Sequence, residues 1–328
     1  MAAAASPLVA PITLLMRTVR CNLCGGTAST QVFASRLPDL GDRDVQEIFA
    51  CTSSAYGECG PIVRCDACGF MYQNPQPDPA WILSAYEDVI DTRYEDEREG
   101  RLHTFRHELE QIGRLTEPGR VLDIGSHVGV FVEVARDMGW RAEGVEPSRW
   151  ASRVARERGL SVTCGTLDDL HARADTYDLV TLWDVIEHLP DPSADLRRLH
   201  SLLRPGGLLA ISTMDVDALV ARLLGRHWPW YMQMHLFYFS RRTLSQLIEK
   251  AGYEVVEIRR HRRIVRAAYL VSRLERRVGS LYGPISRAVE RSGVGRRLVT
   301  VDLGDIITLV ARKPEMSPSE RRNGHGAH

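Results

Sequence analysis

The sequence has no uncharged apolar run near the about 20 residues that a transmembrane helix needs. Residues 1–16 come closest, but two prolines interrupt them and they lack the basic start of a secretion signal. An excess of charge is also missing, because 42 basic residues balance 42 acidic ones. Zero net charge argues against a general nucleic-acid binder. We therefore expect a cytoplasmic protein without a transmembrane segment, beginning with a disordered extension over 1–16.

Four of the seven cysteines form two copies of the pattern Cys-x-x-Cys-Gly: Cys21, Cys24, Cys65 and Cys68. In each copy a tight turn brings two thiolates together, and the glycine allows backbone N–H groups to point at sulfur. Four thiolates form a closed tetrahedral set, so we predict a structural Zn²⁺ in a zinc-ribbon module over 17–78. Free thiols or a disulfide pair are the alternatives. The 40 residues between the two copies hold Cys51 and Cys59, which are alternative ligands.

The remaining chain alternates between apolar strands and helices. An amphipathic helix at 102–115 marks a helical linker or cover over 79–117. Beyond it we expect an α/β domain over 118–313, with a doubly wound, mostly parallel, seven-stranded Rossmann-like sheet and a disordered tail at 314–328. Strands are predicted at 121–124, 142–145, 160–163, 179–183, 208–213, 254–258 and 306–311, and helices at 128–138, 148–158, 192–203 and 241–251. Ligands of such sheets bind beyond the carboxyl ends of the strands.

A glycine turn follows the first strand of this domain and opens a helix. Gly125 permits the sharp turn, Gly129 allows the helix to pack on the sheet, and the exposed N–H groups suit an anionic group. Glu146 ends the next strand, where a carboxylate accepts hydrogen bonds from ribose hydroxyls. The sequence therefore predicts an adenosine-containing cofactor. A dinucleotide is disfavoured, because His127 and Val130 replace two glycines of its G-x-G-x-x-G fingerprint.

Four stretches together resemble class I S-adenosylmethionine-dependent methyltransferases: VLDIGSHVGVF (121–131), GVEPS (144–148), YDLVTLWDVIEHLPDP (177–192) and LLRPGGLLAIST (202–213). The preceding cysteine module is similar to the zinc-binding front of bacterial methyltransferases that act on nucleotide-linked sugars and secondary metabolites. The resemblance implies S-adenosylmethionine as cofactor. It also implies a small-molecule acceptor, such as a nucleotide-linked sugar, methylated on oxygen or carbon.

The resemblance also assigns cofactor-binding roles. Glu146 would hold the ribose, Leu167 and Asp168 would flank the adenine, and Trp183 would lie near the sulfonium. The methionine part would lie on the turn made of Asp123, Gly125, Ser126, His127 and Gly129. His127 stands where the family usually has glycine, and its side chain is expected to narrow the pocket.

A hydroxyl or carbon acceptor needs a base beside it. His188 follows the fourth strand, and His235 follows the aromatic segment 228–231, which can stack on a sugar or planar acceptor. We predict His188, His235 and Asp184 as catalytic residues. Structural roles, in the loop before Pro190 for His188 and in a substrate lid for His235, are the alternatives.

Residues 259–299 hold twelve arginines and two acids, and we expect an arginine-rich helical insertion there. It is either a solvated surface helix or a site that attracts a phosphorylated acceptor or makes weak peripheral contact with an anionic membrane lipid. Two other functions stay open for the whole chain. One is an O-methyltransferase for a small aromatic or quinone-like acceptor, and the other is a catalytically silent zinc-ribbon binding protein that retains a methyltransferase fold.

Overall fold

The computed structural model describes residues 16–37, 48–53, 55–170, 173–272, 279 and 282–315. Most of the predicted extension (1–15) and tail (316–328) therefore lies outside the described residues. Met16, which was expected in the extension, pairs with Pro77 in the two-stranded sheet of β1 (Met16–Arg17) and β5 (Gln76–Pro77). Among the described helices, none combines the length and apolar character of a membrane span.

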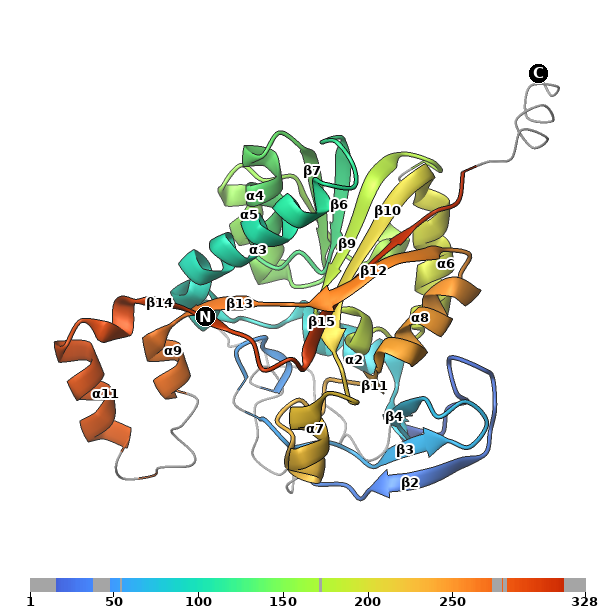
Figure 1. The fold of residues 1–328 in the computed structure, drawn as a ribbon, viewed down its shortest axis with the longest axis horizontal. Helices are drawn as coiled ribbons and strands as arrows, with labels where there is room; N and C mark the ends of the chain where they lie inside the picture. Colours follow the sequence, from blue (N-terminus) through green and yellow to red (C-terminus); the bar gives the residue numbers. More distant parts are fainter. Residues whose placement is uncertain are drawn as a thin grey trace, which may run out of the picture.

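A seven-stranded sheet forms the centre of the molecule (Figure 1) and confirms the predicted fold class. The order across the sheet is β12-β15-β10-β9-β6-β7-β8, and only β15 runs antiparallel to its neighbours. The strands are β6 (Arg120–Ile124), β7 (Arg141–Glu146), β8 (Val162–Cys164), β9 (Tyr177–Trp183), β10 (Leu203–Met214), β12 (Glu254–Arg260) and β15 (Ile306–Arg312).

Helices cover both faces of this sheet because each presents an apolar stripe to it. On one face, Leu109 and Phe131 pack with Val121 and Leu179. On the other face, leucines of two further helices join a larger core. The first face carries α3 (Arg98–Ile112), α4 (Val130–Asp137) and α5 (Arg149–Glu157), and the second carries α6 (Pro192–Leu202) and α8 (Arg241–Lys250).

The cysteine module lies against one end of the central sheet (Figure 1) and has a four-stranded antiparallel sheet of its own, in the order β11-β4-β3-β2. Its first three strands in the chain are β2 (Ser29–Phe33), β3 (Ile62–Cys65) and β4 (Met71–Gln73). The edge strand β11 (Phe237–Tyr238) comes from the other domain, and Phe237 pairs with Tyr72. The two domains therefore share a sheet, which the sequence did not predict.

Three helical segments complete the connections between these sheets. Helix α2 (Pro79–Glu87) begins at the cap Asp78, which accepts a hydrogen bond from the N–H of Ala80, and leads into the 3-10 helix η2 (Thr92–Glu97). The short helix α7 (Leu219–Leu224) follows β10. The elements α2 and η2 fall in the expected helical linker.

The arginine-rich insertion differs from the expectation of an all-helical segment. It begins and ends in two strands that pair antiparallel, β13 (Arg263–Arg266) and β14 (Leu298–Val301). Between them lie α9 (Ala267–Ser272) and α11 (Tyr282–Arg291). Because arginine is a good helix former, the high arginine content favoured a helix, although the β-branched residues of both segments favour strands. Residues 273–278 and 280–281 of the insertion lie outside the described residues.

Candidate active site

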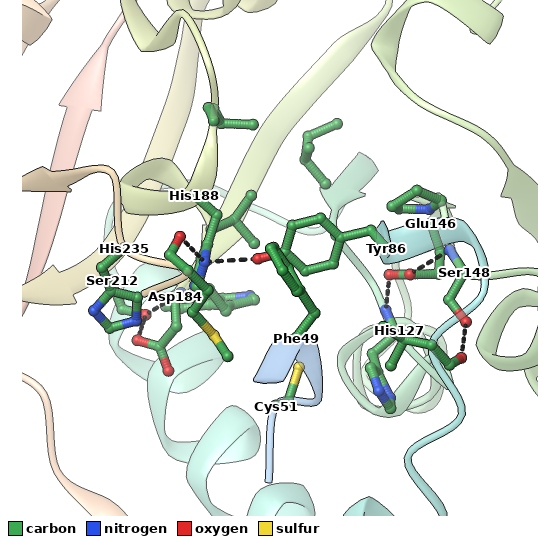
Figure 2. Close-up of a pocket in the computed structure, with 18 of the residues that line it drawn as sticks. Phe49, Cys51, Tyr86, His127, Glu146, Ser148, Asp184, His188, Ser212 and His235 are labelled. Carbon is green, nitrogen blue, oxygen red and sulfur yellow. Dashed lines mark hydrogen bonds between the residues drawn. The ribbon is translucent and has the colours of Figure 1, made fainter. Parts of the chain in front are cut away.

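A cavity of about 580 Å³ opens beyond the carboxyl ends of β6, β7 and β9. The chain leaves β6 for β7 on one side and later returns through β9 on the other, so this is the switch point where ligands bind in such sheets. The volume lies within the range of small-molecule sites. Figure 2 shows Glu146 and Ser148 on one side of the cavity and His188, Asp184 and His235 on the other.

The turn after β6 has a shape that only glycine allows at two positions. Gly125 has φ +68°, and a Cβ there would lie 2.6 Å from Cγ2 of Val185. Gly129 has φ +78°, and a Cβ would lie 2.6 Å from Cδ1 of Leu160. Gly125 therefore lets the turn lie close to Val185 in the loop after β9, and Gly129 lets α4 approach the sheet.

Glu146 is fixed by the backbone at the end of β7. Its Oε1 accepts a hydrogen bond from the N–H of Ser148 at 2.8 Å, and its Oε2 accepts one from the N–H of His127 at 2.8 Å. Each carboxylate oxygen keeps a further lone pair, which can accept a ribose hydroxyl. Burial raises the pKa of Glu146 to about 7, although the two N–H donors oppose that shift.

His127 adopts a left-handed conformation, with φ +50°. Its imidazole stacks on the ring of Tyr94, with centroids 3.8 Å apart, and meets Trp150 edge-on. Burial lowers the pKa of His127 to about 3, so the ring is neutral. Neither ring nitrogen has a hydrogen-bond partner in the described part of the chain. The side chain therefore joins an aromatic stack beside the turn.

Arg101 of α3 is a candidate site residue that the sequence did not indicate, because nothing distinguishes it from the other arginines of that helix. Its guanidinium lies 3.7 Å from the ring centroid of Tyr94 and lines the cavity. No carboxylate among the described residues forms an ion pair with it, and its buried Nε–H lacks an acceptor. A half-buried guanidinium that forms no ion pair within the described residues suits the carboxylate of a ligand.

The other predicted cofactor residues divide into two groups. Leu167, Asp168 and Trp183 line the cavity, although the Asp168 side chain is 88% exposed and pairs with Arg198. Asp123, Ser126 and Gly129 support the turn from behind and do not line the cavity. Asp123 accepts a 2.7 Å hydrogen bond from Thr181, and burial raises its pKa to about 8. The Ser126 hydroxyl lies over Gly144 of β7.

On the opposite wall, His188 and His235 meet with ring centroids 4.7 Å apart. Nδ1 of His188 lies 3.0 Å from the Met234 carbonyl and 2.9 Å from the Tyr86 hydroxyl, and Nδ1 of His235 lies 2.8 Å from the Trp230 carbonyl. A carbonyl can only accept, so each Nδ1 carries the proton and each Nε2 keeps its lone pair. Burial lowers the pKa of His188 to about 4 and that of His235 well below its usual value.

Glu187 stands beside both imidazoles. It was not predicted, because nothing in the sequence distinguishes it from the other acidic residues around His188. The ligand atoms of Glu187, His188 and His235 lie within 4.8 Å of one another. Oε2 of Glu187 accepts a 3.0 Å hydrogen bond from Thr213, whereas Oε1 has no partner within the described residues. Burial, with Asp184 nearby, raises the pKa of Glu187 to about 8. At neutral pH a carboxyl with this pKa is largely protonated, so Glu187 can exchange its proton with the two imidazole lone pairs.

Asp184, at the end of β9, is held by two partners. Its Oδ1 accepts a 2.9 Å hydrogen bond from Ser212, and its Oδ2 pairs with Arg263 of the arginine-rich insertion. Burial opposes ionisation, but Arg263 and His261 hold the pKa of Asp184 below its usual value. The carboxylate is therefore ionised and already engaged, which fits a positioning role better than that of a base.

Residues 230–238, here called the acceptor loop, line one side of the cavity with Trp230, Met232, Met234 and His235. The indole N–H groups of Trp228 and Trp230 both donate to Oδ2 of Asp305, at 2.9 and 3.0 Å. The guanidinium of Arg263 lies 5.1 Å from the Trp230 ring centroid. Phe49 and Tyr86 meet edge-on across the cavity, between its two sides (Figure 2). The insert between the two cysteine pairs therefore contributes to the site.

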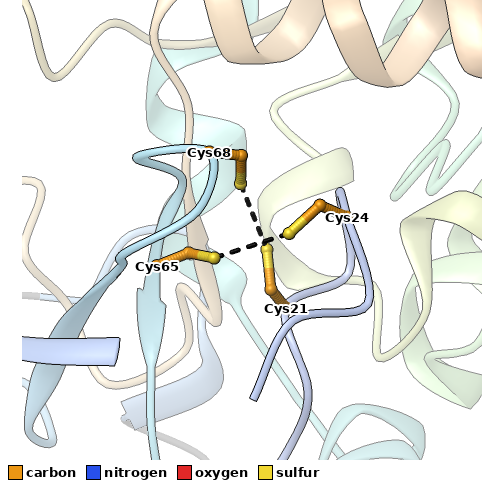
Figure 3. A group of neighbouring side chains, drawn as sticks. All are labelled: Cys21, Cys24, Cys65 and Cys68. Atoms are coloured by element: carbon orange, nitrogen blue, oxygen red, sulfur yellow. Dashed lines mark hydrogen bonds between the residues drawn. The ribbon is translucent and has the colours of Figure 1, made fainter. Parts of the chain in front are cut away.

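Figure 3 shows the four predicted cysteine ligands brought together, with their sulfurs within 4.8 Å of one another. Sγ of Cys21 lies 3.5 Å from that of Cys68, and Sγ of Cys24 lies 3.5 Å from that of Cys65. These separations, and glycines with positive φ at Gly25 and Gly69, fit a tetrahedral zinc ion. Although burial opposes it, N–H donors from Cys68 and Ala67 lower the pKa of Cys65 to about 7.

The alternative ligands lie elsewhere. Cys59 does not join the cluster, and Cys51 lies by the cavity, its sulfur within 4.8 Å of ligand atoms of Asp91 and His127. Of the twelve arginines of the insertion, those near its start pair with carboxylates of this chain, among them Arg262 with Asp302, Arg263 with Asp184, and Arg266 with Glu99.

Comparison with known proteins points to one chemistry. A family model described as a methyltransferase domain matches residues 94–258. C-methyltransferase NovU of Streptomyces niveus is 31% identical over 155 residues, covering 46% of this chain and 36% of that protein. A ubiquinone biosynthesis O-methyltransferase of Xanthomonas axonopodis pv. citri is 35% identical over 116 residues, covering 33% of this chain and 48% of that protein. Each match covers less than half of the relative's length.

Among solved structures, this chain is similar to a SAM-dependent methyltransferase of Thermotoga maritima, described as a possible histamine N-methyltransferase. The structural match covers 66% of this chain and 90% of that one. The TM-score is 0.45 and the identity 20%.

Proposed function

Because the chain belongs to the methyltransferase-domain family, we propose that it transfers a methyl group from S-adenosylmethionine to oxygen or carbon of a small-molecule acceptor. The acceptor is a sugar-containing compound, such as a nucleotide-linked sugar, or another secondary metabolite. One observation carries the proposal. A single cavity joins an anchored carboxylate with free lone pairs, Glu146, to two neutral imidazoles, His188 and His235.

The cofactor half is formed by Glu146, Arg101 and the turn at Gly125. When bound, S-adenosylmethionine supplies an electrophilic methyl group on its sulfonium. Glu146 accepts hydrogen bonds from the ribose, and Arg101 pairs with the methionine carboxylate, which gives its buried Nε–H an acceptor. The open lone pairs of Glu146 and the lone guanidinium are the features that fit this group.

The acceptor half is formed by the Glu187, His188 and His235 group together with the rings of Trp230 and Tyr86. A neutral imidazole takes the proton of the acceptor's hydroxyl or enolisable carbon, and Glu187 in its ionised form pairs with the imidazolium that results. Trp230 and Tyr86 flank the acceptor, while Asp184 and Arg263 fix the floor beneath it. The four clustered cysteines hold a structural zinc ion.

A second candidate is an O-methyltransferase for a small aromatic or quinone-like acceptor. The edge-on pair of Phe49 and Tyr86 and the ring of Trp230 offer faces to a planar ring, and a matched relative is a ubiquinone biosynthesis enzyme. Parallel screens of nucleotide sugars and catechols with labelled cofactor separate the two candidates.

The first test is calorimetry with S-adenosylhomocysteine, with NADH as the control ligand. We expect micromolar binding of the former alone, about −8 kcal/mol at a Kd of 1 μM. A folded, zinc-loaded protein that binds neither ligand would contradict the proposal and favour the silent binding protein.

A further inference from the structure

Gln73 is a buried amide at the end of β4, the strand that follows the second cysteine pair. Its Nε2 lies within hydrogen-bond distance of three carbonyl oxygens of the acceptor loop: those of Met232 (3.0 Å), Gln233 (3.0 Å) and His235 (2.6 Å). An amide group has two hydrogens, so the three carbonyls share them. Its Oε1 accepts the N–H of Gly60 at 3.2 Å, which fixes the orientation of the amide.

Backbone hydrogen bonds hold the same loop from both sides. The N–H of Gln73 donates to the Leu236 carbonyl at 2.9 Å, and the N–H of Leu236 donates to the Glu187 carbonyl at 2.8 Å. Phe237 then pairs with Tyr72 and stacks on Phe70, with ring centroids 5.7 Å apart. The segment that contains His235 is therefore hydrogen-bonded on one side to the cysteine module and on the other to the loop that contains Glu187 and His188.

The cofactor half has no comparable dependence on the module's strands. Both hydrogen bonds to Glu146 come from the loops that follow β6 and β7. The cysteine pair 65–68, in contrast, is the turn between β3 and β4. A bound metal thus orders the hairpin that ends at Gln73.

We propose that Gln73 is the positioning residue for His235, and that the β3–β4 hairpin of the metal-binding module sets the geometry of the acceptor half of the site, while the cofactor half does not depend on that hairpin. The inference deepens the proposed function and rests on it for the role of His235. The module is then a working part of the acceptor site. It does not act as an independent binding domain.

Gln73→Met tests this, because it keeps the length and volume of the side chain and removes its donors. Leaving buried carbonyls unpaired costs enough for about tenfold faster amide exchange across the acceptor loop. The pKa of His235, followed by NMR of the ring protons, should move toward its ordinary value while that of His261 stays unchanged. The affinity for S-adenosylhomocysteine should change less than about twofold. Gln31→Met, at an exposed position of β2 in the same sheet, is the matched control.

Unchanged loop exchange and an unchanged His235 titration in Gln73→Met would overturn the inference. Equal changes at His261 or in the Gln31 variant would also overturn it, because they indicate general loosening. If Gln73→Met does not fold, Gln73→Asn, which retracts the amide but keeps its polarity, takes its place with the same readouts. Exchange and titration need no cofactor, so a wild-type protein that fails to bind S-adenosylhomocysteine contradicts the proposed function separately.

Discussion

The two halves of the cavity are built in different ways. The cofactor half rests on three adjacent parallel strands, and its key carboxylate, Glu146, is held by N–H groups of the turns next to it. The acceptor half is assembled from segments far apart in the chain. Phe49, Tyr86, His188, Trp230 and Arg263 come from five such segments.

This difference indicates how such a protein can change acceptor without changing cofactor. A site held by its own strand ends depends on few other residues, and substitutions elsewhere leave it intact. The geometry of a site that is formed by several separate segments changes when any one of those segments is altered. We therefore expect acceptor specificity to depend on the cysteine module, the acceptor loop and the insertion, and cofactor binding to depend on the central sheet.

The largest expected effect comes from breaking the cysteine cluster. Cys65→Ser removes one ligand of the proposed zinc site, and a structural zinc ion contributes on the order of 10 kcal/mol of folding free energy in zinc-finger peptides. We expect loss of bound zinc in elemental analysis, a lower Tm and fast amide exchange in the acceptor loop. S-adenosylhomocysteine should still bind within about threefold of wild type. Cys164→Ser, exposed and outside the cluster, is the control. Equal loss of cofactor affinity in a variant whose central sheet stays folded would show that the halves are not separable.

Arg101→Met should weaken S-adenosylhomocysteine binding by about 10- to 100-fold, because a charge-assisted hydrogen bond is worth about 1.5–3 kcal/mol. Methylthioadenosine, which lacks the amino-acid part, should bind wild type and variant equally in calorimetry. Arg101→Lys keeps the charge without the planar fork and should lie between them. A parallel loss for both ligands would mean that Arg101 supports the cavity without contacting the carboxylate.

Glu146 predicts a pH dependence of cofactor binding. Burial raises its pKa to about 7, so the carboxylate is ionised above that pH and protonated below it. If the ionised form accepts the ribose hydroxyls, affinity for S-adenosylhomocysteine falls by up to about tenfold per pH unit below about 7. An unshifted glutamate would keep full affinity to near pH 5. Glu146→Gln should bind weakly at every pH, and a wild-type profile as flat as that of the variant would rule out this role.

The smallest effect is expected at His127. Glycine there relieves a left-handed side-chain position, but it also removes the stack on Tyr94. The relief of backbone strain and the loss of the ring stack are each about 1 kcal/mol and opposite in sign. His127→Gly should therefore change Tm little and the affinity for S-adenosylhomocysteine by less than about threefold. A large gain in affinity would instead mean that the imidazole blocks the wild-type cavity.

The sequence predicted those parts of the molecule whose signals are local. Alternating apolar strands, the turn at Gly125 and Gly129, and the paired Cys-x-x-Cys-Gly patterns each lie within a few neighbouring residues. The structure has the predicted central sheet and brings the four cysteines together. Glu146 and the two histidines line one cavity. Their roles remain predictions.

Contacts between distant segments could not be predicted in the same way. Strand β11 has two residues and gains its partner from a module over 160 positions earlier, so no periodicity signals it. Arg101 differs from its neighbouring arginines only in facing an aromatic ring inside the cavity. Glu187 stands out only through burial next to two imidazoles. The strands of the insertion were hidden by its arginine content, although Ile264 and Val265 carry a β signal.

The single oxygen of Asp305 that receives two indole N–H groups provides an optical reporter. Trp228 is fully enclosed, whereas Trp230 faces the cavity, so the two fluorophores share an anchor and differ in their access to a ligand. An acceptor that enters beside Trp230 alters its emission, and a Trp230→Phe variant, which keeps the other five of the six tryptophans, supplies the background. Candidate acceptors can therefore be sorted by comparing fluorescence titrations of the unlabelled wild type and this variant before any turnover is measured.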